Sequence, residues 1–416
     1  MRHIVLFSFF IFLHHLDAKL SVQVESPYAC LINAETGRVL YEKNARTKIY
    51  PASTMKLATM LYAYEQKKND LEEIVTVHPD ALRRTSEHEK KITDYAIPAH
   101  YLEPDGTMIY IRKHERLSIE SLLFGAHMRS ANDACNALAV HLAGDMHTFM
   151  LDFNSWVQSL GVENTHFVNP HGLHHPEHYS TAYDMALIGR AAYHNPHFME
   201  MALKRMYTKP KTNYQKQETW RSNCCILREG DELSYSKVLF AKTGQMKTAK
   251  YCLVAAATNG ERTLIAAIHK SPTWKQRYLD VIQMFESAFN ENKESRLLFP
   301  KEETRFEKKV PGASSLLVAV PDRDIAISYY PSEEPKFDAK LEWDDKAITL
   351  PIKQGSCVAK IRLYDGNKDP IKSFDLHASH AVNKKRMLRP KWAVIGAFMF
   401  ILVGYRLFKR RPEDTK

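Results

Sequence analysis

The chain has 416 residues, of which 44% are hydrophobic and 25% are charged, a globular composition that excludes wholesale disorder. Its length predicts two or three domains, and its 15 Gly and 19 Pro exclude collagen-like or low-complexity architecture. The net charge of +10 would suit a nucleic-acid partner, but ten basic and two acidic residues after residue 382 carry +8 of it. The rest of the chain is nearly neutral, so we expect no nucleic-acid partner.

The N-terminus reads as a secretory signal. Arg2 supplies a positive charge, residues 4–13 form a mostly apolar run, and Ala18 offers a small residue at a cleavage point. We therefore expect residues 1–18 to be a signal peptide that exports the rest of the chain. Leu16 fits the cleavage site poorly, so retention of this segment as an anchor is the alternative.

Residues 19–292 are expected to form an α/β body, because helical and strand patterns alternate along them. The expected helices are 53–66, a pair within 118–143, 146–160, 182–193 and 274–290; the expected strands are a hairpin at 28–33 and 38–41, then 74–77, 108–112, 240–243, 251–258 and 262–269.

After about residue 292, short strands alternate with Pro, Asp and Gly turns and predict a small all-β domain over 293–378. Its expected strands are 316–320, 325–330, 340–342, 347–350, 358–363 and 371–375.

The C-terminus is expected to be a single membrane anchor. A basic linker at 379–391 precedes residues 392–408, which are apolar apart from Arg406 and just long enough to span about 30 Å of hydrocarbon. Trp392 and Tyr405 stand where interfacial aromatic residues belong. Because the signal peptide exports the body, residues 409–416 are expected to form a cytoplasmic tail. An amphipathic surface helix is the alternative.

Neither the cysteines nor the histidines predict a metal site. The six Cys show no metal-ligand spacing, and in an exported chain they permit disulfides without indicating a pairing. His171, His174, His175 and His178 crowd one loop, but no helix-spaced ligand pair accompanies them. We expect no metal and no cofactor.

Three short motifs carry nucleophilic chemistry. In Ser53-Thr54-Met55-Lys56, the spacing i, i+3 at a helix start lets the lysine amine reach the serine hydroxyl and, with a lowered pKa, accept its proton. Ser130-Ala131-Asn132 is a polar turn between two apolar helical stretches, and Lys242-Thr243-Gly244 ends an apolar strand with groups that suit a carboxylate. Each motif alone is equally typical of a helix cap or a turn.

The three motifs in the order S-x-x-K, S-x-N, K-T-G resemble those of the active-site serine penicillin-recognising enzymes. Their surroundings are similar to low-molecular-mass penicillin-binding proteins, the serine D-alanyl-D-alanine carboxypeptidases, over about residues 25–290. The matching runs are Tyr50-Pro-Ala-Ser-Thr-Met-Lys56, Met128-Arg-Ser-Ala-Asn-Asp133, Asn169-Pro-His-Gly-Leu173 and His178-Tyr-Ser-Thr-Ala182. The resemblance implies a β-lactamase/transpeptidase-like domain, an antiparallel sheet flanked by helices, before the β domain and anchor.

The resemblance implies a role for each motif residue. Ser53 would be the acylating nucleophile that attacks the bond between the two terminal D-alanines of a peptidoglycan stem peptide, and Lys56 would be its base. Ser130 would relay a proton to the leaving amine. Asn132 would bind the substrate carbonyl and steady the lysine. The third motif, Lys242, Thr243 and Gly244, would receive the terminal carboxylate. No metal is required, and β-lactams would inhibit covalently.

The resemblance also implies roles for Gln245 and Arg277. The backbone N–H of Gln245 would complete the oxyanion hole with that of Ser53. Arg277 falls where the family often places a carboxylate-binding arginine, and an ordinary surface arginine is the alternative. The sequence departs from the family at Gln245-Met246, where His or Tyr and then Thr are usual, and at residues 80–113, which are longer and more polar.

We therefore expect a serine D,D-carboxypeptidase, anchored by one C-terminal helix in a bacterial inner membrane with its catalytic domain on the extracytoplasmic side. A D,D-endopeptidase that cuts cross-links is the closest alternative, and a catalytically silent peptidoglycan-binding protein is an alternative of another class. A class A-like β-lactamase would need a deacylating Glu in an E-x-x-L-N-type loop, and the residues after Glu163 do not fit that pattern. The sequence does not indicate an oligomeric state.

Overall fold

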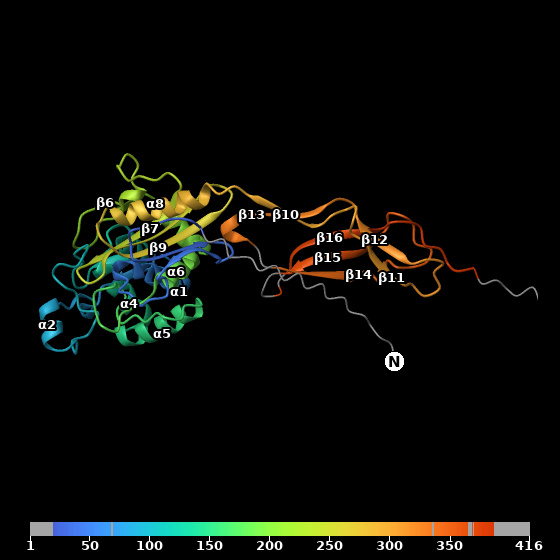
Figure 1. The fold of residues 1–416 in the computed structure, drawn as a ribbon. Coiled ribbons are helices and arrows are strands. Elements are labelled where there is room, and N and C mark those ends of the chain that lie inside the picture. The colour runs from blue at the N-terminus through green and yellow to red at the C-terminus, as the bar shows by residue number, and fades with distance from the viewer. Residues whose placement is uncertain (1–19, 68–69, 335–336, 365–367, 369, 387–416) are drawn as a thin grey trace, which may run out of the picture. The chain divides into compact units, whose positions relative to one another are not determined.

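The computed structural model describes residues 20–67, 70–334, 337–364, 368 and 370–386 (Figure 1). These residues divide into two compact units. The first unit runs to Lys293 and also includes Tyr330–Glu334, and the second comprises Glu294–Tyr329 and the chain from Pro335 onward.

The first unit is built on a five-stranded antiparallel sheet in the order β2-β1-β9-β8-β7. Its strands are β1 (Tyr28–Asn33), β2 (Val39–Lys43), β7 (Val238–Met246), β8 (Lys250–Thr258) and β9 (Thr263–Ser271). The predicted hairpin and the three later strands are all present. The inner strands β8 and β9 are buried on both faces, which explains why they read as continuous apolar runs rather than as alternating patterns.

Helices cover both faces of this sheet (Figure 1). On one face, α8 (Gln276–Phe289) packs on β8 and β9 through Tyr278, Val281 and Phe285. The other face carries the larger core, formed by α1 (Lys56–Lys67), α3 (Ile119–Met128), α4 (Asn132–Ala143), α5 (Met146–Ser159) and α6 (Ala182–His194). This mixed α/β unit confirms the predicted fold class for the body.

One predicted strand of the first unit is wrong. Residues 108–112 are irregular, and the partner of β3 (Ile74–Thr76) is instead β4 (Arg116–Ser118). The backbone N–H groups of Ile109 and Ile111 donate to the buried carboxylate of Asp133 rather than to a neighbouring strand. A side chain from α4 thus takes the place of a strand ladder.

Several short elements were not predicted. They include the 3₁₀ turns η1 (Ala52–Met55), η2 (Pro79–Leu82) and η3 (Cys225–Leu227), the helices α2 (Glu87–Ile92) and α7 (Pro196–Leu203), and the hairpin of β5 (Met206–Lys209) with β6 (Glu218–Arg221). The start of α2 is fixed by a capping box between Ser86 and Glu89. Helices this short lack the long apolar periodicity on which sequence prediction depends.

The second unit is all-β, as predicted. A five-stranded antiparallel sheet has the order β11-β12-β16-β15-β14, and β10 pairs with β13. The strands are β10 (Glu294–Phe299), β11 (Phe306–Lys308), β12 (Leu317–Pro321), β13 (Ile325–Tyr329), β14 (Asp338–Trp343), β15 (Cys357–Tyr364) and β16 (Pro370–Ala378). Residues 347–350 are not the expected strand, because the Asp344 carboxylate accepts the N–H groups of Lys346 and Ala347 and closes a turn there.

The segment Tyr330–Glu334, which contains η4 (Pro331–Glu333), belongs to the first unit although strands of the second unit precede and follow it. Its Glu333 forms an ion pair with Arg262 at 2.8 Å, and Glu291 forms another with the same guanidinium at 2.9 Å. The Arg262 guanidinium also lies 3.7 Å from the centre of the Tyr330 ring. Because the Arg262 side chain is only 4% exposed, these acidic residues supply the charge that its burial requires.

The chain after β16 stays attached to the second unit, inside the stretch expected as a linker. Val382 is fully buried, and Lys384 forms a β-bridge with Ala313. The predicted signal peptide (1–18) and the predicted membrane segment (392–408) lie outside the described residues. Within the described ranges, no helix is long and apolar enough to cross a membrane.

Candidate active site

Ser53 and Lys56 lie where η1 passes into α1. Ser53 sits in the 3₁₀ turn, rather than in the α-helix as expected, and Lys56 is the first residue of α1. The turn is entered through Ala52, which has the unusual φ of +49° for a non-glycine residue. This strained entry places the Ser53 hydroxyl 2.8 Å from the Lys56 amine.

Lys56 is fully buried, and its amino group donates to three acceptors. Its Nζ lies 2.8 Å from Ser53 Oγ, 2.7 Å from Asn132 Oδ1 and 2.5 Å from the carbonyl oxygen of His171. Burial lowers the pKa of Lys56 to about 8. An appreciable fraction of the amine is therefore neutral near neutral pH, and a neutral amine can take the serine proton.

The second motif forms the turn between α3 and α4. Ser130 has a φ of +55°, and Asn132 is the first residue of α4. Thr107 holds the turn from outside: its hydroxyl donates to the Ser130 carbonyl at 2.6 Å, and its carbonyl accepts the Asn132 N–H at 2.8 Å. The long segment before α3, which contains Thr107, is thus hydrogen-bonded to this motif and holds it in place.

The third motif faces the second one across the site. Lys242, buried in β7, donates to Ser130 Oγ at 2.8 Å and to the Thr243 carbonyl at 3.1 Å. Burial, and then the positive charge of Lys56, lower the pKa of Lys242 to about 7. The Ser130 hydroxyl therefore accepts from a cation that gives up its proton easily, which suits a proton relay.

Glycines let the strand and the turn approach each other. A Cβ on Gly244 would lie 2.9 Å from the Pro51 carbonyl oxygen and 3.1 Å from the Ser53 nitrogen. On the opposite side, Gly172 has a φ of +93°, and a Cβ there would lie 2.3 Å from the Ala52 carbonyl oxygen. Two backbone segments therefore approach the serine turn so closely that only glycine fits at the points of contact.

Arg277 is not an ordinary surface residue, since it is only 8% exposed. From α8 it donates to the Gly244 carbonyl at 3.3 Å and to the Tyr278 hydroxyl at 3.1 Å, while its Nε is buried without a partner in the described part of the chain. Gln245, next to Gly244, has an exposed side chain. The sequence-predicted residues of all three motifs and Arg277 therefore gather in one region.

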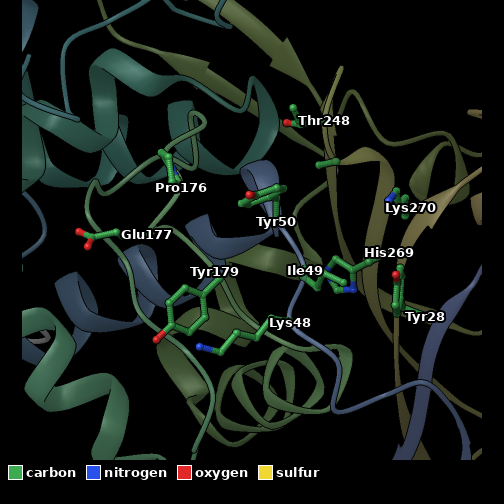
Figure 2. A pocket seen from close by; sticks show the side chains of 11 residues that line it. Tyr28, Lys48, Ile49, Tyr50, Pro176, Glu177, Tyr179, Thr248, His269 and Lys270 are labelled. Atoms are coloured by element: carbon green, nitrogen blue, oxygen red, sulfur yellow. The ribbon is translucent and has the colours of Figure 1, made fainter. Parts of the chain in front are cut away.

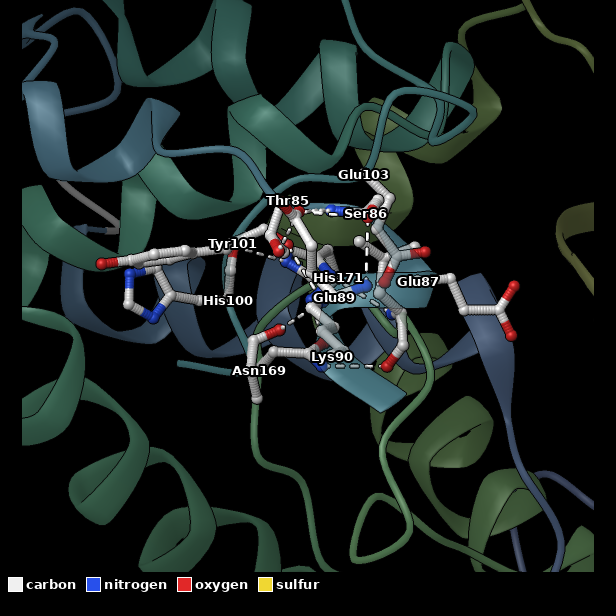
Figure 3. A network of polar contacts seen from close by, with 12 residues as sticks. Thr85, Ser86, Glu87, Glu89, Lys90, His100, Tyr101, Glu103, Asn169 and His171 are labelled. Carbon is white, nitrogen blue, oxygen red and sulfur yellow. Dashed lines mark hydrogen bonds and ion pairs between the residues drawn. The ribbon is translucent and has the colours of Figure 1, made fainter. Parts of the chain in front are cut away.

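A polar network holds the loop that contains His171 (Figure 3). The His100 carbonyl accepts from the His171 ring at 3.1 Å and from the Asn136 amide at 2.8 Å. The buried ion pair of Lys90 and Glu103, at 2.9 Å, fixes the segment around His100, because Lys90 also donates to the Tyr101 carbonyl at 3.1 Å. The network thus connects this polar segment to the loop that supplies the third acceptor of Lys56.

Sequence reasoning named the His171 loop but missed its backbone acceptor. A carbonyl group has no sequence signature, so nothing identified it. The ion pair of Lys90 and Glu103 joins residues 13 positions apart in a segment read as irregular, and only their unusual polarity hinted at a role.

The described residues contain no cluster of three or more His, Cys, Asp or Glu placed to hold a metal ion. His171 and His178 are buried, and burial lowers the pKa of both. All six cysteines lie in the described part of the chain as free thiols.

Comparison with known proteins identifies the family. The model of the peptidase S11 family, described as D-alanyl-D-alanine carboxypeptidase, matches residues 15–273. A D-alanyl-D-alanine carboxypeptidase of Bacillus subtilis is 30% identical over 336 residues, covering 80% of this chain and 79% of its own. One of Haemophilus influenzae is 27% identical over 379 residues, covering 89% and 88%.

Solved structures agree with this match. Penicillin-binding protein 5 from Haemophilus influenzae superimposes with a TM-score of 0.58 at 25% identity, covering 87% of this chain and 99% of its own. A carboxypeptidase from Francisella tularensis, at 20% identity and a TM-score of 0.58, shares the fold. The chain therefore belongs to the peptidase S11 family of D-alanyl-D-alanine carboxypeptidases.

Proposed function

We propose that this protein is a serine D,D-carboxypeptidase that removes the terminal D-alanine from peptidoglycan stem pentapeptides through an acyl-enzyme. The observation that carries the proposal is the buried Lys56 amine, 2.8 Å from the Ser53 hydroxyl and with a pKa lowered to about 8. A serine beside such a lysine is an activated nucleophile rather than a helix cap.

Acylation uses the first two motifs. Lys56 takes the proton of Ser53 as Oγ attacks the carbonyl between the two D-alanines, and the backbone N–H groups of Ser53 and Gln245 stabilise the developing oxyanion. When the C–N bond breaks, Ser130 passes a proton to the leaving D-alanine amine. Asn132 holds both the catalytic lysine and the substrate carbonyl.

Recognition uses the third motif. Lys242 and Thr243 hold the terminal carboxylate of the substrate, and Arg277 adds positive charge behind Gly244. Water then attacks the acyl carbonyl, Ser53 leaves with a proton, and the shortened peptide is released. A β-lactam carries a carboxylate and a reactive amide in one molecule, so it acylates Ser53 by the same route.

The nucleophile is tested by mass. Incubation with a penicillin should add one penicillin mass to the intact protein, on Ser53, and Ser53→Ala should abolish the adduct. Ser314→Ala, at an exposed serine of the second unit, is the matched control and should label normally. An unlabelled wild-type protein would overturn the enzyme proposal.

The reaction is tested with two substrates. A purified stem pentapeptide should release free D-alanine, while a cross-linked peptide dimer should stay intact. Cleavage of the dimer in preference to the pentapeptide would instead assign the protein as a D,D-endopeptidase.

We further propose that the protein acts at the extracytoplasmic face of a bacterial inner membrane. The proposal is supported by the apolar segments at residues 4–13 and 392–408 and by the basic residues that flank the second of them.

A further inference from the structure

A cavity of about 390 Å³ lies beside the catalytic segment and contains none of the three motifs (Figure 2). Tyr50, which lines it, stands three residues before Ser53, and Thr248 lines it from the turn that joins β7 to β8. The loop of Pro176–Tyr179 and the end of β9 supply the other walls. The cavity is therefore built from the same chain segments that shape the catalytic centre.

His269, on β9, lines this cavity and is fully buried, yet neither of its ring nitrogens has a hydrogen-bond partner in the described part of the chain. Burial lowers the pKa of His269 to about 3, so the ring is neutral and presents one donor and one acceptor. Buried polar groups normally have partners, so the two unpartnered ring nitrogens of His269 indicate a polar occupant.

The unpaired ring restricts what the occupant can be. An anion only accepts hydrogen bonds and a cation only donates them, so either would leave one nitrogen of His269 unsatisfied. A hydroxyl or an amide offers both a donor and an acceptor. Neutral groups of this kind are therefore the best match for the buried end of the cavity.

The walls are aromatic and carry mixed charge. Tyr28, Tyr50 and Tyr179 line the cavity, and Lys48 lies 3.8 Å from the centre of the Tyr179 ring. Glu177 and Lys270 also line the cavity, so its wall carries charges of both signs. Flat amphipathic rings surrounding a few polar groups suit the apolar face and hydroxyl edge of a sugar ring.

We propose that this cavity binds an N-acetylated saccharide, with His269 hydrogen-bonded to its hydroxyl or acetamido groups and the tyrosines packed against its rings. The choice of sugar rests on the proposed function, because peptidoglycan stem peptides are carried on a chain of N-acetylated sugars. Bound there, the glycan holds its own stem peptide close to Ser53.

The test measures binding of the N-acetylglucosamine tetramer to the purified full-length protein by calorimetry. Cellotetraose is the matched control, since it has the same ring and linkage with a hydroxyl in place of each acetamide. We expect the tetramer to bind at least tenfold more tightly than cellotetraose. No binding of the tetramer, or equal binding of both sugars, would overturn the proposal.

Variants locate the site. His269→Phe keeps a ring but removes both nitrogens and should weaken tetramer binding at least tenfold, whereas His269→Gln keeps a donor and an acceptor and should bind more tightly than His269→Phe. Tyr179→Ala, at a partly exposed position, should also weaken binding and guards against misfolding of the buried variant. Unchanged binding in both His269→Phe and Tyr179→Ala would refute the assignment.

Penicillin labelling of the same samples separates this inference from the proposed function. Labelling reports Ser53 and should persist in all three variants, which also shows that they are folded. Labelling without sugar binding overturns the saccharide site alone, and sugar binding without labelling overturns the enzyme proposal alone.

Discussion

The proposed mechanism needs two buried lysines in opposite protonation states. In it, Lys56 is neutral to accept a proton from Ser53, while Lys242 is charged to hold a carboxylate. Burial lowers the pKa of Lys56 to about 8, and burial together with the positive charge of Lys56 lowers the pKa of Lys242 to about 7. The two groups therefore titrate as a coupled pair close to neutral pH.

This coupling predicts the pH dependence of acylation. Raising the pH through about 8 removes the proton from Lys56 and speeds acylation, while raising it through about 7 discharges Lys242 and weakens carboxylate binding. The second-order rate constant for penicillin acylation should therefore be bell-shaped, with its maximum between pH 7 and pH 8. A stopped-flow profile still rising above pH 9 would contradict this assignment.

Glu103 is predicted to be essential for stability through its ion pair. Glu103→Gln leaves the Lys90 ammonium buried without a counter-charge, and such a loss costs about 3–5 kcal/mol. Chemical denaturation measures the change in the free energy of unfolding. Glu87→Gln is the matched control, because its pair with Lys91 is exposed to solvent and contributes little to the free energy of unfolding. Equal losses in the two variants would contradict the buried role.

The side chains of the three motifs were predicted from the sequence, and the carbonyl group that accepts from Lys56 was not. Ser53, Lys56, Ser130 and Lys242 could be predicted because each has a side chain typical of its chemistry at a recognisable spacing. The His171 carbonyl could not, because any residue supplies a carbonyl and only the fold brings this one to the lysine.

At the scale of elements, the site depends on how closely β7 approaches the serine turn. Gly244→Ala places a methyl group 2.9 Å from the Pro51 carbonyl oxygen and forces strand and turn apart. We expect penicillin acylation to slow by about 100-fold, the scale on which misplaced reacting groups lose rate.

The control for that variant is Gly312→Ala in the second unit. Gly312 has a φ of +77° and open space around it, so alanine there costs about 1–3 kcal/mol of backbone strain without touching the site. Acylation should be unchanged in this variant. A normal rate in Gly244→Ala would show that the approach is not required.

The elements with long apolar patterns were predicted well, but the irregular segments that connect them were not. The inner strands β8 and β9 and the paired helices α3 and α4 could be predicted because burial imposes a repeating pattern on the sequence. The failed strand at 108–112 shows the limit. Ile109 and Ile111 are buried, but their N–H groups pair with Asp133, a contact between residues more than 20 positions apart.

At the scale of the molecule, the anchor proposal predicts a soluble truncation. A chain that ends at Arg386 keeps Val382 in its buried place and lacks the proposed membrane segment. After export, this truncated protein should appear in the soluble fraction and should bind penicillin as the full chain does. Fractionation with the membranes would contradict a C-terminal anchor.

The ion pairs of Arg262 bear on how this molecule can be divided. Because Tyr330–Glu334 belongs to the first unit, the chain passes between the units three times, and no single cleavage separates them. A fragment that stops at Lys293 would retain the Arg262 guanidinium and Glu291 but lose Glu333. The first unit is therefore not complete at the end of its last helix, α8. The buried charge of Arg262 also needs Glu333, which follows Lys293 by some forty positions and stands in the sequence between strands β13 and β14 of the second unit.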